Sequence, residues 1–558
     1  MLVRQPSGHL TRQGIGPSWT AVKAGLAIMM AGGLTLATAV EANSAASPAP
    51  TPDALQDDPL DQPTQLQAEL RARDKAQVTA ALKALSTQTD AFIAPALVEP
   101  RSTPVLVLPG RATPYDLAAL AAQHPIALSA RPDSAILLHL PVIVGPGATL
   151  GADATTARTV LLTSSARGYA PLIAAGGTIA FTGTPFQPLA VRSFDPSTGQ
   201  ADTDLTDGRA YVSASATRMD LDHVVASDLG FLVGETSGVA WMARGGTPSS
   251  GGASDSTFTR NYFGAYSSGA VGLVFSRSQF LDNIVYGLDP HTGTRQSVVE
   301  DSLAAGNGRH GVILSRQCDD NVVRRLRSVD NGGAGIVVDD GFDGGPLALG
   351  PSNRNRFIDV EVARNQTAGI VVEGGEGNSV DAGRIADSPV GVWIKNGARH
   401  TSITNTAISR SSQTGIRINS GTAGTTVRNV TIADSHVGVA SDGARLTTLT
   451  DVEVTDSTAA AIEINGDPDQ VSAAHTVVQG SGRVAFLLDG TSAAPADMSG
   501  IDASRWSEST TGRNAIGRID FWIRLLPWIL VLAIPAMFRM RTRATIRRRR
   551  TQIPRGET

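Results

Sequence analysis

The chain has 558 residues, of which 58 are glycine, 41% are apolar and 5% are aromatic, and its net charge is −4. This composition excludes a disordered protein, which combines low hydrophobicity with high net charge, and it suits a long β structure with many turns. Eight arginines lie in the last twenty residues, which leaves 39 basic and 50 acidic residues in the rest. An acidic body excludes general nucleic-acid binding, and a single cysteine, Cys318, excludes an intramolecular disulfide.

The N-terminal segment has the features of an export signal. Basic residues precede an apolar run at 24–40 and small residues follow it, so residues 1–42 are predicted to be a signal peptide or an N-terminal anchor. Residues 43–102 are predicted to hold a linker and then one amphipathic helix within 64–95. We expect this helix to cap the following domain or to hold it off a membrane.

Residues 103–490 carry a repeat of glycine followed by a short apolar strand. The intervals between the glycines are 23, 24, 24, 34, 22, 24 and 23 residues, and the long interval contains a glycine-rich loop. The column consists of Gly264, Gly287, Gly311, Gly335, Gly369, Gly391, Gly415, Gly438 and then Ala461. A sustained period near 23 with β-type strands predicts an all-β, right-handed parallel β-helix. A leucine-rich repeat would need helical segments and a leucine consensus, and neither occurs.

Two further columns follow from the repeat. Alternation within strands places Val312 and Leu314, and likewise Ile416 and Ile418, in the core. Polar residues stand four positions before the glycines, at Asn283, Asn307, Asn331, Asn365, Asp387, Ser411 and Asp434. We expect them to form a ladder that satisfies backbone groups of the turns, with no catalytic role.

The C-terminal region predicts a membrane tether. A linker at 491–518 precedes an apolar segment at 519–538, which is predicted to be a transmembrane helix, and a basic tail at 539–558. The positive-inside rule places this tail in the cytoplasm. The body is therefore expected outside the cytoplasmic membrane, in the periplasm or at the cell surface.

One coil breaks the repeat. In the sequence Leu288-Asp289-Pro290-His291, alternation points Leu288 and Pro290 inward and Asp289 and His291 outward. Proline removes a hydrogen bond from a parallel strand and is normally excluded from its centre. A rule broken within an otherwise regular repeat indicates a functional position.

The next coils bring charged residues to the same place. A period of 24 residues stacks Ser315 on His291 and Arg316 on Thr292, and the following coil adds Asp339 and Asp340. The residues expected to converge on one face are Asp289, His291, His310, Arg316 and Asp340. Histidine can act as a base near neutral pH, and arginine neutralises a planar carboxylate.

This pair of groups suits removal of the proton next to a carboxylate, such as the C5 proton of a uronic acid. Return of a proton from the opposite face makes an epimerase, and loss of the C4 oxygen makes a lyase. An exposed histidine and arginine without catalytic function are the simpler alternative. Asp339, Asp340 and Asp343 could bind Ca²⁺, but an acidic loop in which Asp340 pairs with Arg316 is the favoured interpretation.

Residues 255–316 resemble the periplasmic mannuronan C5-epimerases. The resemblance rests on Asp282 to His291, which contains a YG-[IL]-DPH block, and on His310 to Arg316, an HG-[IV]-I-[IL]-SR block. A weaker match upstream includes Arg209. The resemblance implies that His291 is the base, Arg316 neutralises the uronate carboxylate and Asp289 orients His291 or holds substrate. It also implies substrate contacts for Tyr286 and His310, with no metal and no cofactor.

The chain departs from the family at Thr292, where the family usually has a second aspartate after the histidine. We count Tyr286, His310, Thr292, Asp340 and Arg209 as predicted substrate-binding residues. The predicted function is C5-epimerisation of a polyuronate, with a uronan lyase or hydrolase and a non-catalytic polysaccharide-binding or assembly protein as alternatives. The expected partners are an anionic polysaccharide, the cytoplasmic membrane and a polysaccharide synthesis or secretion complex.

Overall fold

The computed structural model describes residues 63–85, 88–95, 103–341, 350–466, 470–489 and 497–508. The chain divides into two compact units, Met1–Asp57 and Asp58–Thr558, and all the described residues belong to the second. The segments predicted at 1–42, 519–538 and 539–558 lie outside the described residues. Among the residues that are described, no helix is both long enough and apolar enough to cross a membrane.

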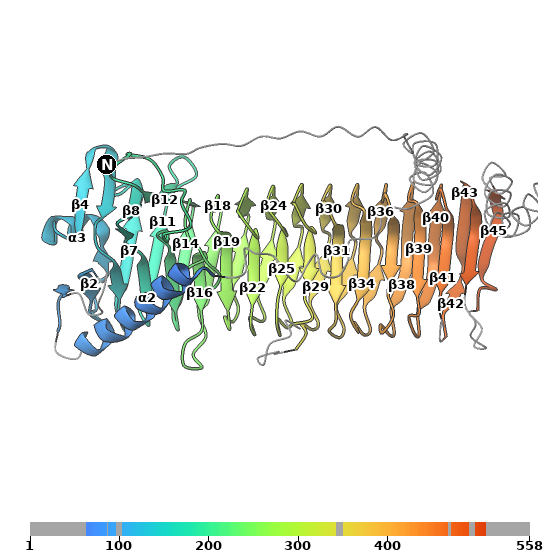
Figure 1. Ribbon diagram of the computed structural model, residues 1–558, viewed down its shortest axis with the longest axis horizontal. Coiled ribbons are helices and arrows are strands. Elements are labelled where there is room, and N and C mark those ends of the chain that lie inside the picture. The colour runs from blue at the N-terminus through green and yellow to red at the C-terminus, as the bar shows by residue number, and fades with distance from the viewer. Residues whose placement is uncertain are drawn as a thin grey trace, which may run out of the picture. The chain divides into compact units, whose positions relative to one another are not determined.

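The described part is a stack of coils, each built from short strands that pair with the same strands of the coils before and after it (Figure 1). It contains two α-helices, α2 (Gln65–Ala84) and α3 (Leu117–Gln123), and one short 3-10 helix, η4 (Pro132–Ser134). The named strand pairs are parallel except for β1 with β2, β4 with β5 and β8 with β9. The expectation of an all-β parallel β-helix is confirmed.

The strands form three columns. The first, called sheet A, consists of β1 (Phe92–Ala94), β2 (Val105–Leu108), β6 (Val142–Val144), β10 (Leu172–Ala175), β13 (Val212–Ser215), β16 (Gly238–Met242), β19 (Phe263–Ser268), β22 (Leu288–His291), β25 (Val312–Leu314), β28 (Ile336–Val338), β31 (Ala368–Glu373), β34 (Val390–Lys395), β37 (Thr414–Ile418), β39 (Val437–Asp442), β41 (Ala460–Asn465) and β44 (Val484–Asp489).

The second column consists of β3 (Tyr115–Asp116), β7 (Thr149–Asp153), β11 (Thr178–Thr182), β14 (Arg218–Asp222), β17 (Ser250–Ser254), β20 (Val274–Ser276), β23 (Val298–Glu300), β26 (Val322–Arg324), β29 (Arg356–Ile358), β32 (Ser379–Asp381), β35 (Ser402–Thr404), β38 (Thr426–Ala433), β40 (Thr448–Thr455) and β42 (Ser472–Ala474).

The third column consists of β4 (Leu128–Arg131), β5 (Ala135–Leu138), β8 (Thr159–Ser165), β12 (Leu189–Phe194), β15 (Val224–Ser227), β18 (Thr257–Thr259), β21 (Gln279–Leu281), β24 (Leu303–Ala305), β27 (Arg327–Val329), β30 (Glu361–Ala363), β33 (Arg384–Ala386), β36 (Ala407–Ser409), β43 (Thr476–Gly482) and β45 (Ile501–Glu508). The long strands β38 and β40 continue into this column, and β9 (Gly168–Tyr169) pairs with β8.

The core and the glycine column follow the sequence pattern. Val312, Leu314, Ile416 and Ile418 are almost fully buried in one continuous apolar core, as predicted. A Cβ atom on Gly287 would lie 2.5 Å from the carbonyl oxygen of the next glycine in the column, Gly311. Consecutive coils therefore approach too closely at this corner for a side chain, which explains why glycine recurs there.

The predicted polar ladder forms up to Asn365 and continues at Ser388, but Ser411 does not extend it, because its buried hydroxyl has no hydrogen-bond partner among the described residues. From Asn283 to Asn365 each buried asparagine accepts a hydrogen bond from the backbone N–H of the residue one coil earlier. The next member is Ser388, whose hydroxyl accepts from the Asn365 N–H at 3.2 Å. Asp387 instead pairs with Arg410 at the surface, and Ser435 rather than Asp434 is buried two coils beyond Ser388. The assignment of these two aspartates to the ladder is wrong, because in their coils the buried residue stands three positions before the glycine instead of four.

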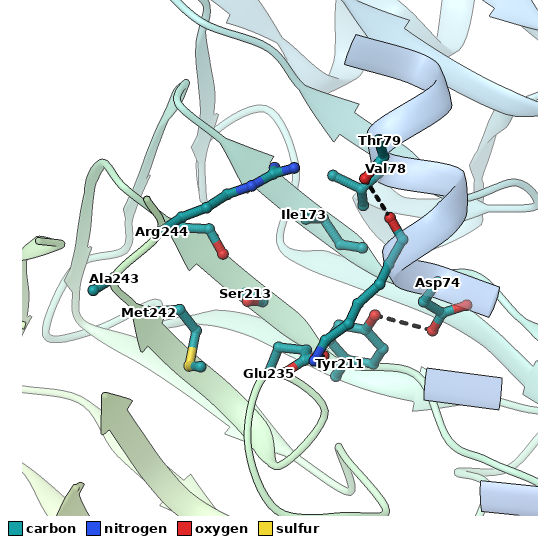
Figure 2. A pocket seen from close by; sticks show the side chains of 12 residues that line it. Asp74, Val78, Thr79, Ile173, Tyr211, Ser213, Glu235, Met242, Ala243 and Arg244 are labelled. Carbon is teal, nitrogen blue, oxygen red and sulfur yellow. Dashed lines mark hydrogen bonds and ion pairs between the residues drawn. The ribbon is translucent and has the colours of Figure 1, made fainter. Parts of the chain in front are cut away.

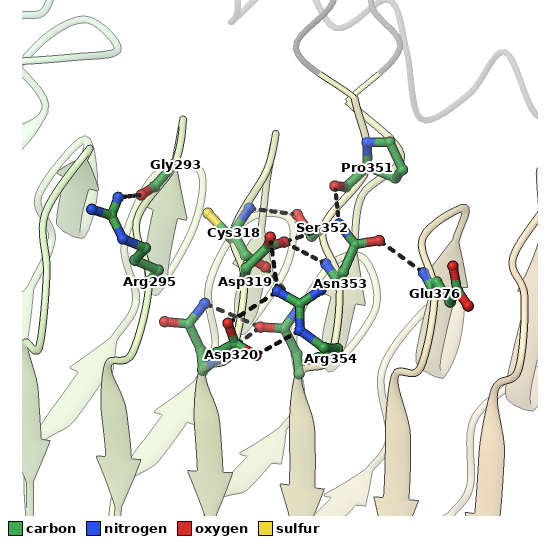
Figure 3. Close-up of polar contacts among 12 residues, drawn as sticks. Gly293, Arg295, Cys318, Asp319, Asp320, Pro351, Ser352, Asn353, Arg354 and Glu376 are labelled. Carbon is green, nitrogen blue, oxygen red and sulfur yellow. Dashed lines mark hydrogen bonds and ion pairs between the residues drawn. The ribbon is translucent and has the colours of Figure 1, made fainter.

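The outer corners are tied by acid–arginine pairs between neighbouring coils. Arg354 donates to both Asp319 and Asp320, and the Asn353 amide donates to Asp319 at 3.0 Å (Figure 3). Similar pairs join Asp301 to Arg325 and other corners along the stack. Each exposed ion pair contributes little to the free energy of unfolding. We therefore expect these pairs to help fix the register between neighbouring coils and not to provide most of the stability.

The two ends of the stack differ from the predicted boundaries. Helix α2 begins at the Thr64 cap and ends at Ala84, and residues 92–94 of the predicted helical region form strand β1. The last strand, β45, lies within the segment predicted as the linker 491–518. Figure 1 shows α2 running along the side of the first coils. It is attached to the coils by Arg71 with Glu235 at 3.2 Å and by Gln77 with the Thr103 carbonyl at 2.7 Å.

Candidate active site

The candidate site starts at strand β22 of sheet A. Leu288 is fully buried in the core, and the carbonyl of Pro290 accepts hydrogen bonds from Ser315 N–H and from the buried Cys318 thiol. Because proline has no N–H, the ladder between β22 and β25 is reduced to one pair, Leu288 with Val312, and resumes as a bridge between His291 and Ser315. Strand β22 therefore keeps Leu288 and Pro290 packed on the inner side, while the side chains of Asp289 and His291 lie on the outer face of sheet A.

Side chains on the outer face of sheet A stand in two columns. The His291 column consists of Ser215, Met242, Ser268, His291, Ser315, Asp339, Glu373 and Lys395. The Asp289 column consists of Ser213, Ala240, Tyr266, Asp289, Ile313, Val337, Val371, Trp393 and Arg417. Successive members are separated by roughly one strand spacing of 4.8 Å.

His291 is half-buried and is held by its own coil. Its Nδ1 is hydrogen-bonded to the hydroxyl of Thr292, and its ring lies 5.5 Å from the Tyr266 ring, centre to centre. Thr292 has a positive φ of 43°, which turns the chain back beneath the imidazole. The threonine that stands where the family usually has an aspartate is therefore a hydrogen-bond partner of the histidine.

Asp289 lies on the outer side of the strand, as predicted, but only 1% of its surface is exposed. Burial, and secondarily the negative charge of Asp289, raises the pKa of the neighbouring Tyr266 phenol well above its ordinary value. The expectation that Asp289 faces solvent is wrong, because side chains of the adjoining coils pack over it. Its position suits a group that orients its neighbours.

Arg316 lies one coil beyond His291, directly after Ser315. Its backbone has a positive φ of 61°, and its carbonyl accepts from Gly293 N–H at 2.8 Å. The side chain is half-buried rather than inside the core. Ser315 forms a parallel β-bridge with His291. Arg316 is the next residue, so its side chain starts one residue beyond the bridged position on the neighbouring coil. The predicted pairing of these two coils is thus present.

The next coils hold an acidic cluster with one lysine. Carboxylate oxygens of Asp339, Asp340 and Glu373 lie within 4.8 Å of one another, and Glu373 pairs with Lys395 at 2.9 Å. Burial, together with the charges of Glu373 and Asp340, raises the pKa of Asp339 to about 7, although Arg316 opposes this rise. Asp339 thus exchanges its proton near neutral pH. Asp343, the third aspartate of the predicted loop cluster, lies outside the described residues.

His310 and Tyr286 form a wall beside this face. Their rings stack at 5.4 Å with an angle of 7°, and Arg309 donates to the Tyr286 hydroxyl at 2.9 Å. Nδ1 of His310 accepts from the Ala334 N–H, and burial lowers the pKa of His310 to about 3. This histidine is 3% exposed. Its predicted place on the open face is therefore wrong, because it is a neutral packing and hydrogen-bonding group.

Arg209 is a structural residue in this fold. It is 2% exposed, and its guanidinium donates to the backbone carbonyls of Gly230 and Leu229, both at 2.8 Å. These hydrogen bonds satisfy backbone carbonyls at a turn between coils that lies several strands away from β22. The placement disagrees with the predicted substrate contact, because the donors are already committed to backbone acceptors.

Three residues of the outer face did not emerge from the sequence, namely Glu373, Trp393 and Lys395. Lys395 Nζ lies 4.5 Å from the centre of the Trp393 ring, and Arg417 lies 5.4 Å from it on the next strand. Their signal was polar or aromatic residues at outward positions of otherwise apolar strands. The 34-residue interval before Gly369 hid their register with His291.

Comparison with known proteins agrees with this architecture. A family model described as "Right handed beta helix region" matches residues 344–478. A mannuronan C5-epimerase of Pseudomonas fluorescens is 36% identical over 78 residues, which are 14% of this chain and 15% of that protein. A mannuronan C5-epimerase of Pseudomonas putida is 30% identical over 118 residues, or 21% of each chain.

Among solved structures, the periplasmic alginate epimerase AlgG aligns with 74% of this chain and 96% of its own, at 17% identity and a TM-score of 0.49. The sequence matches to the curated relatives span about a seventh to a fifth of their length. The coiled parallel strands and the family match nevertheless agree on the architecture. The chain is therefore a right-handed β-helix protein that is similar, over part of its length, to mannuronan C5-epimerases.

Proposed function

We propose that this protein epimerises uronic acid residues at C5 within an anionic polysaccharide of the mannuronan type. The observation that carries the proposal is the bridge between His291 and Ser315, because Arg316 directly follows Ser315 on the coil next to His291. One group can accept a proton and the other can neutralise a carboxylate. The partial sequence similarity to mannuronan C5-epimerases supports the same reaction.

The chemistry follows from these two groups. With a proton on Nδ1 donated to Thr292, the lone pair of His291 lies on Nε2, which takes the C5 proton of the sugar. The C5–H electron pair moves into the carboxylate, and Arg316 stabilises the additional negative charge that develops there. A water molecule on the opposite face of the ring then donates a proton to C5, and the proton held by His291 returns to the solvent to neutralise the hydroxide that is left. The sugar keeps its composition and its glycosidic bonds.

The outer face continues beyond the reacting sugar. Lys395, three coils from Arg316, is 2% exposed and pairs with Glu373. Arg417, four coils from Arg316, is part-exposed and lies 5.4 Å from the centre of the Trp393 ring, so it is the cationic group of this stretch that can hold a further acidic sugar. Asp339 lies between them and Arg316, and the raised pKa of Asp339 keeps its carboxyl largely neutral below pH 7. A neutral group at that place limits repulsion of a polyanion.

The place of action is also part of the proposal. The export signal expected at 1–42 and the tether expected at 519–538 would put the β-helix outside the cytoplasmic membrane. An enzyme held there could modify a polysaccharide as it is made or secreted. Complexes with synthesis or secretion proteins are compatible with this position.

Incorporation of solvent deuterium at C5 of polymannuronate tests the reaction. A lyase would use the same base and arginine but would expel the C4 oxygen and give unsaturated products that absorb ultraviolet light. A binding protein would give neither deuterium incorporation nor cleavage. The three candidate functions therefore separate in one incubation.

A further inference from the structure

A cavity lies on the outer face of sheet A, between helix α2 and strands β10, β13 and β16 (Figure 2). Its lining includes Lys75 and Val78 of the helix and Ser213, Met242 and Arg244 of the sheet side. Ser213 and Met242 belong to the two outer columns defined by Asp289 and His291, three and two strands earlier in the stack. The cavity is therefore aligned with the candidate active site, at roughly 10 to 15 Å from it.

The walls of this cavity are preformed. The Asp74 carboxylate of α2 is 5% exposed and accepts hydrogen bonds from the Tyr169 and Tyr211 hydroxyls at 2.8 and 3.0 Å. Glu235 pairs with both Arg71 and Lys75 of the helix at 3.2 Å. These buried and part-buried contacts fix the helix against the sheet, so a ligand would not have to create the site.

One buried polar group in the lining lacks a partner. Ser213 is 1% exposed, and its hydroxyl oxygen has no hydrogen-bond partner in the protein. A buried hydroxyl without a partner is destabilising, because its lost bonds to water are not replaced. Figure 2 shows Ser213 on the sheet side of the cavity, across from α2. A hydroxyl or carboxylate of a ligand in the cavity would satisfy it.

The charges favour an acidic ligand. The two carboxylates of the lining, Asp74 and Glu235, already have cationic partners. Arg244 is exposed and forms no ion pair with any residue that the structure describes. Its side chain extends from the sheet side towards α2 (Figure 2). A planar guanidinium is the side chain best suited to a carboxylate, and Met242 offers an apolar surface to a sugar ring.

We propose that this cavity is a distal subsite that binds one uronate residue of the same polysaccharide whose reacting residue lies at His291. Arg244 binds the carboxylate, Ser213 bonds to a polar group of the sugar, and Met242 contacts the ring. The inference rests on the proposed function, because it takes the same polyuronate as ligand. Chains long enough to reach from His291 to Arg244 bind more tightly than short ones.

The test combines length-dependent kinetics with a methyl probe. Full-length protein labelled at methionine methyl groups is titrated with mannuronate octamer, mannuronate trimer and a neutral mannose octamer. The octamer is expected to shift the Met242 signal and to leave Met219, which is fully buried in the core, unchanged. Arg244→Ala is expected to raise the KM for the octamer about tenfold and to leave the KM for the trimer unchanged.

The control variant is Arg192→Ala, which removes an exposed charge from strand β12 of another column and should leave both KM values unchanged. Ser213→Ala should weaken octamer binding two- to threefold without changing trimer turnover. This inference would be overturned if C5 exchange occurred while the Met242 signal stayed unchanged, or if Arg244→Ala changed the KM values for octamer and trimer equally. The proposed function would stand in either case. Equal shifts from the neutral octamer would also overturn this inference. An octamer-specific Met242 shift without C5 exchange would support the subsite and refute the epimerase.

Discussion

His291 forms a parallel β-bridge with Ser315, and Arg316 follows directly on that second strand. The base and the guanidinium are thus separated by one coil of the stack, a distance set by backbone hydrogen bonds rather than by flexible loops. The Thr292 N–H donates to the Ser315 carbonyl at 2.9 Å and the Gly293 N–H donates to the Arg316 carbonyl at 2.8 Å. Because backbone hydrogen bonds join the two coils at consecutive residues, His291 and Arg316 are attached to a rigid backbone.

Replacement of Arg316 tests the neutralisation of the carboxylate. Arg316→Ala is expected to lower kcat/KM for polymannuronate about 10²- to 10³-fold, because the charge that develops in the transition state loses its partner. Arg316→Lys should recover only part of this loss, since an ammonium group cannot make the planar, two-point contact. The control is Arg399→Ala, at an exposed position far along the stack. Full activity in Arg316→Lys would argue against a planar contact.

Thr292 is predicted to position His291 and not to contact substrate. Thr292→Val removes the hydroxyl that is bonded to Nδ1 and is expected to lower kcat about three- to tenfold while KM stays constant. Thr292→Ser retains the hydroxyl and should restore kcat. A change in KM alone, or no rescue by serine, would count against a positioning role and favour a direct substrate contact.

Asp339 predicts a dependence on pH. Because its pKa is raised to about 7, it is largely neutral below that pH, and above it a negative charge forms beside Glu373 and Asp340, with Arg316 facing the group. The KM for a polyanion should therefore rise above pH 7 in the wild type. In Asp339→Asn this rise should be reduced, as measured by initial rates from pH 5.5 to 8.5.

The same shift affects stability. A carboxyl whose folded pKa lies above its unfolded pKa binds its proton more tightly in the folded state, so wild-type stability decreases as the pH rises from about 4 to 7. The Tm of Asp339→Asn should therefore exceed that of the wild type by more at pH 8 than at pH 4.5. An equal difference at both values would show that Asp339 has an ordinary pKa.

The asparagine ladder is expected to contribute strongly to stability. Asn307 accepts from the N–H of Asn283 at 3.1 Å and donates to Asn331 and to the Phe280 carbonyl. Asn307→Ala leaves buried backbone groups without partners and should lower the free energy of unfolding by about 3 kcal/mol. The matched control is Arg325→Ala in an exposed corner pair, which should shift the urea midpoint much less. Equal shifts of the urea midpoint in the two variants would show that the ladder contributes no more to stability than an exposed ion pair does.

Much of the fold could be predicted, because a solenoid repeats the same local decision in every coil. The glycine column and the alternation of Val312 and Leu314 were readable without coordinates. Ser388 was missed as the successor of Asn365 in the ladder because one coil is a residue shorter at that corner. Fixed spacing from a glycine cannot detect such a local deletion.

The candidate site was predictable where a strand rule was broken. Pro290 marked the coil, and the period placed Arg316 beside it. His310 and Arg209 were misplaced because both lie outside the strands, where alternation does not determine which way a side chain points. The position of Glu373 and Lys395 relative to His291 depends on register across a long insertion, which the sequence does not encode locally.

The most direct test measures deuterium at C5 by NMR after incubation of polymannuronate in D₂O with wild-type protein and with His291→Ala. The control is His400→Gln, at an exposed histidine that pairs with Glu376. The wild type and His400→Gln are predicted to incorporate deuterium and to form the C5 epimer, and His291→Ala should be slower by about 10²- to 10⁴-fold. Undiminished incorporation by His291→Ala would contradict the assignment of the base, and no incorporation by the wild type would contradict the proposed reaction.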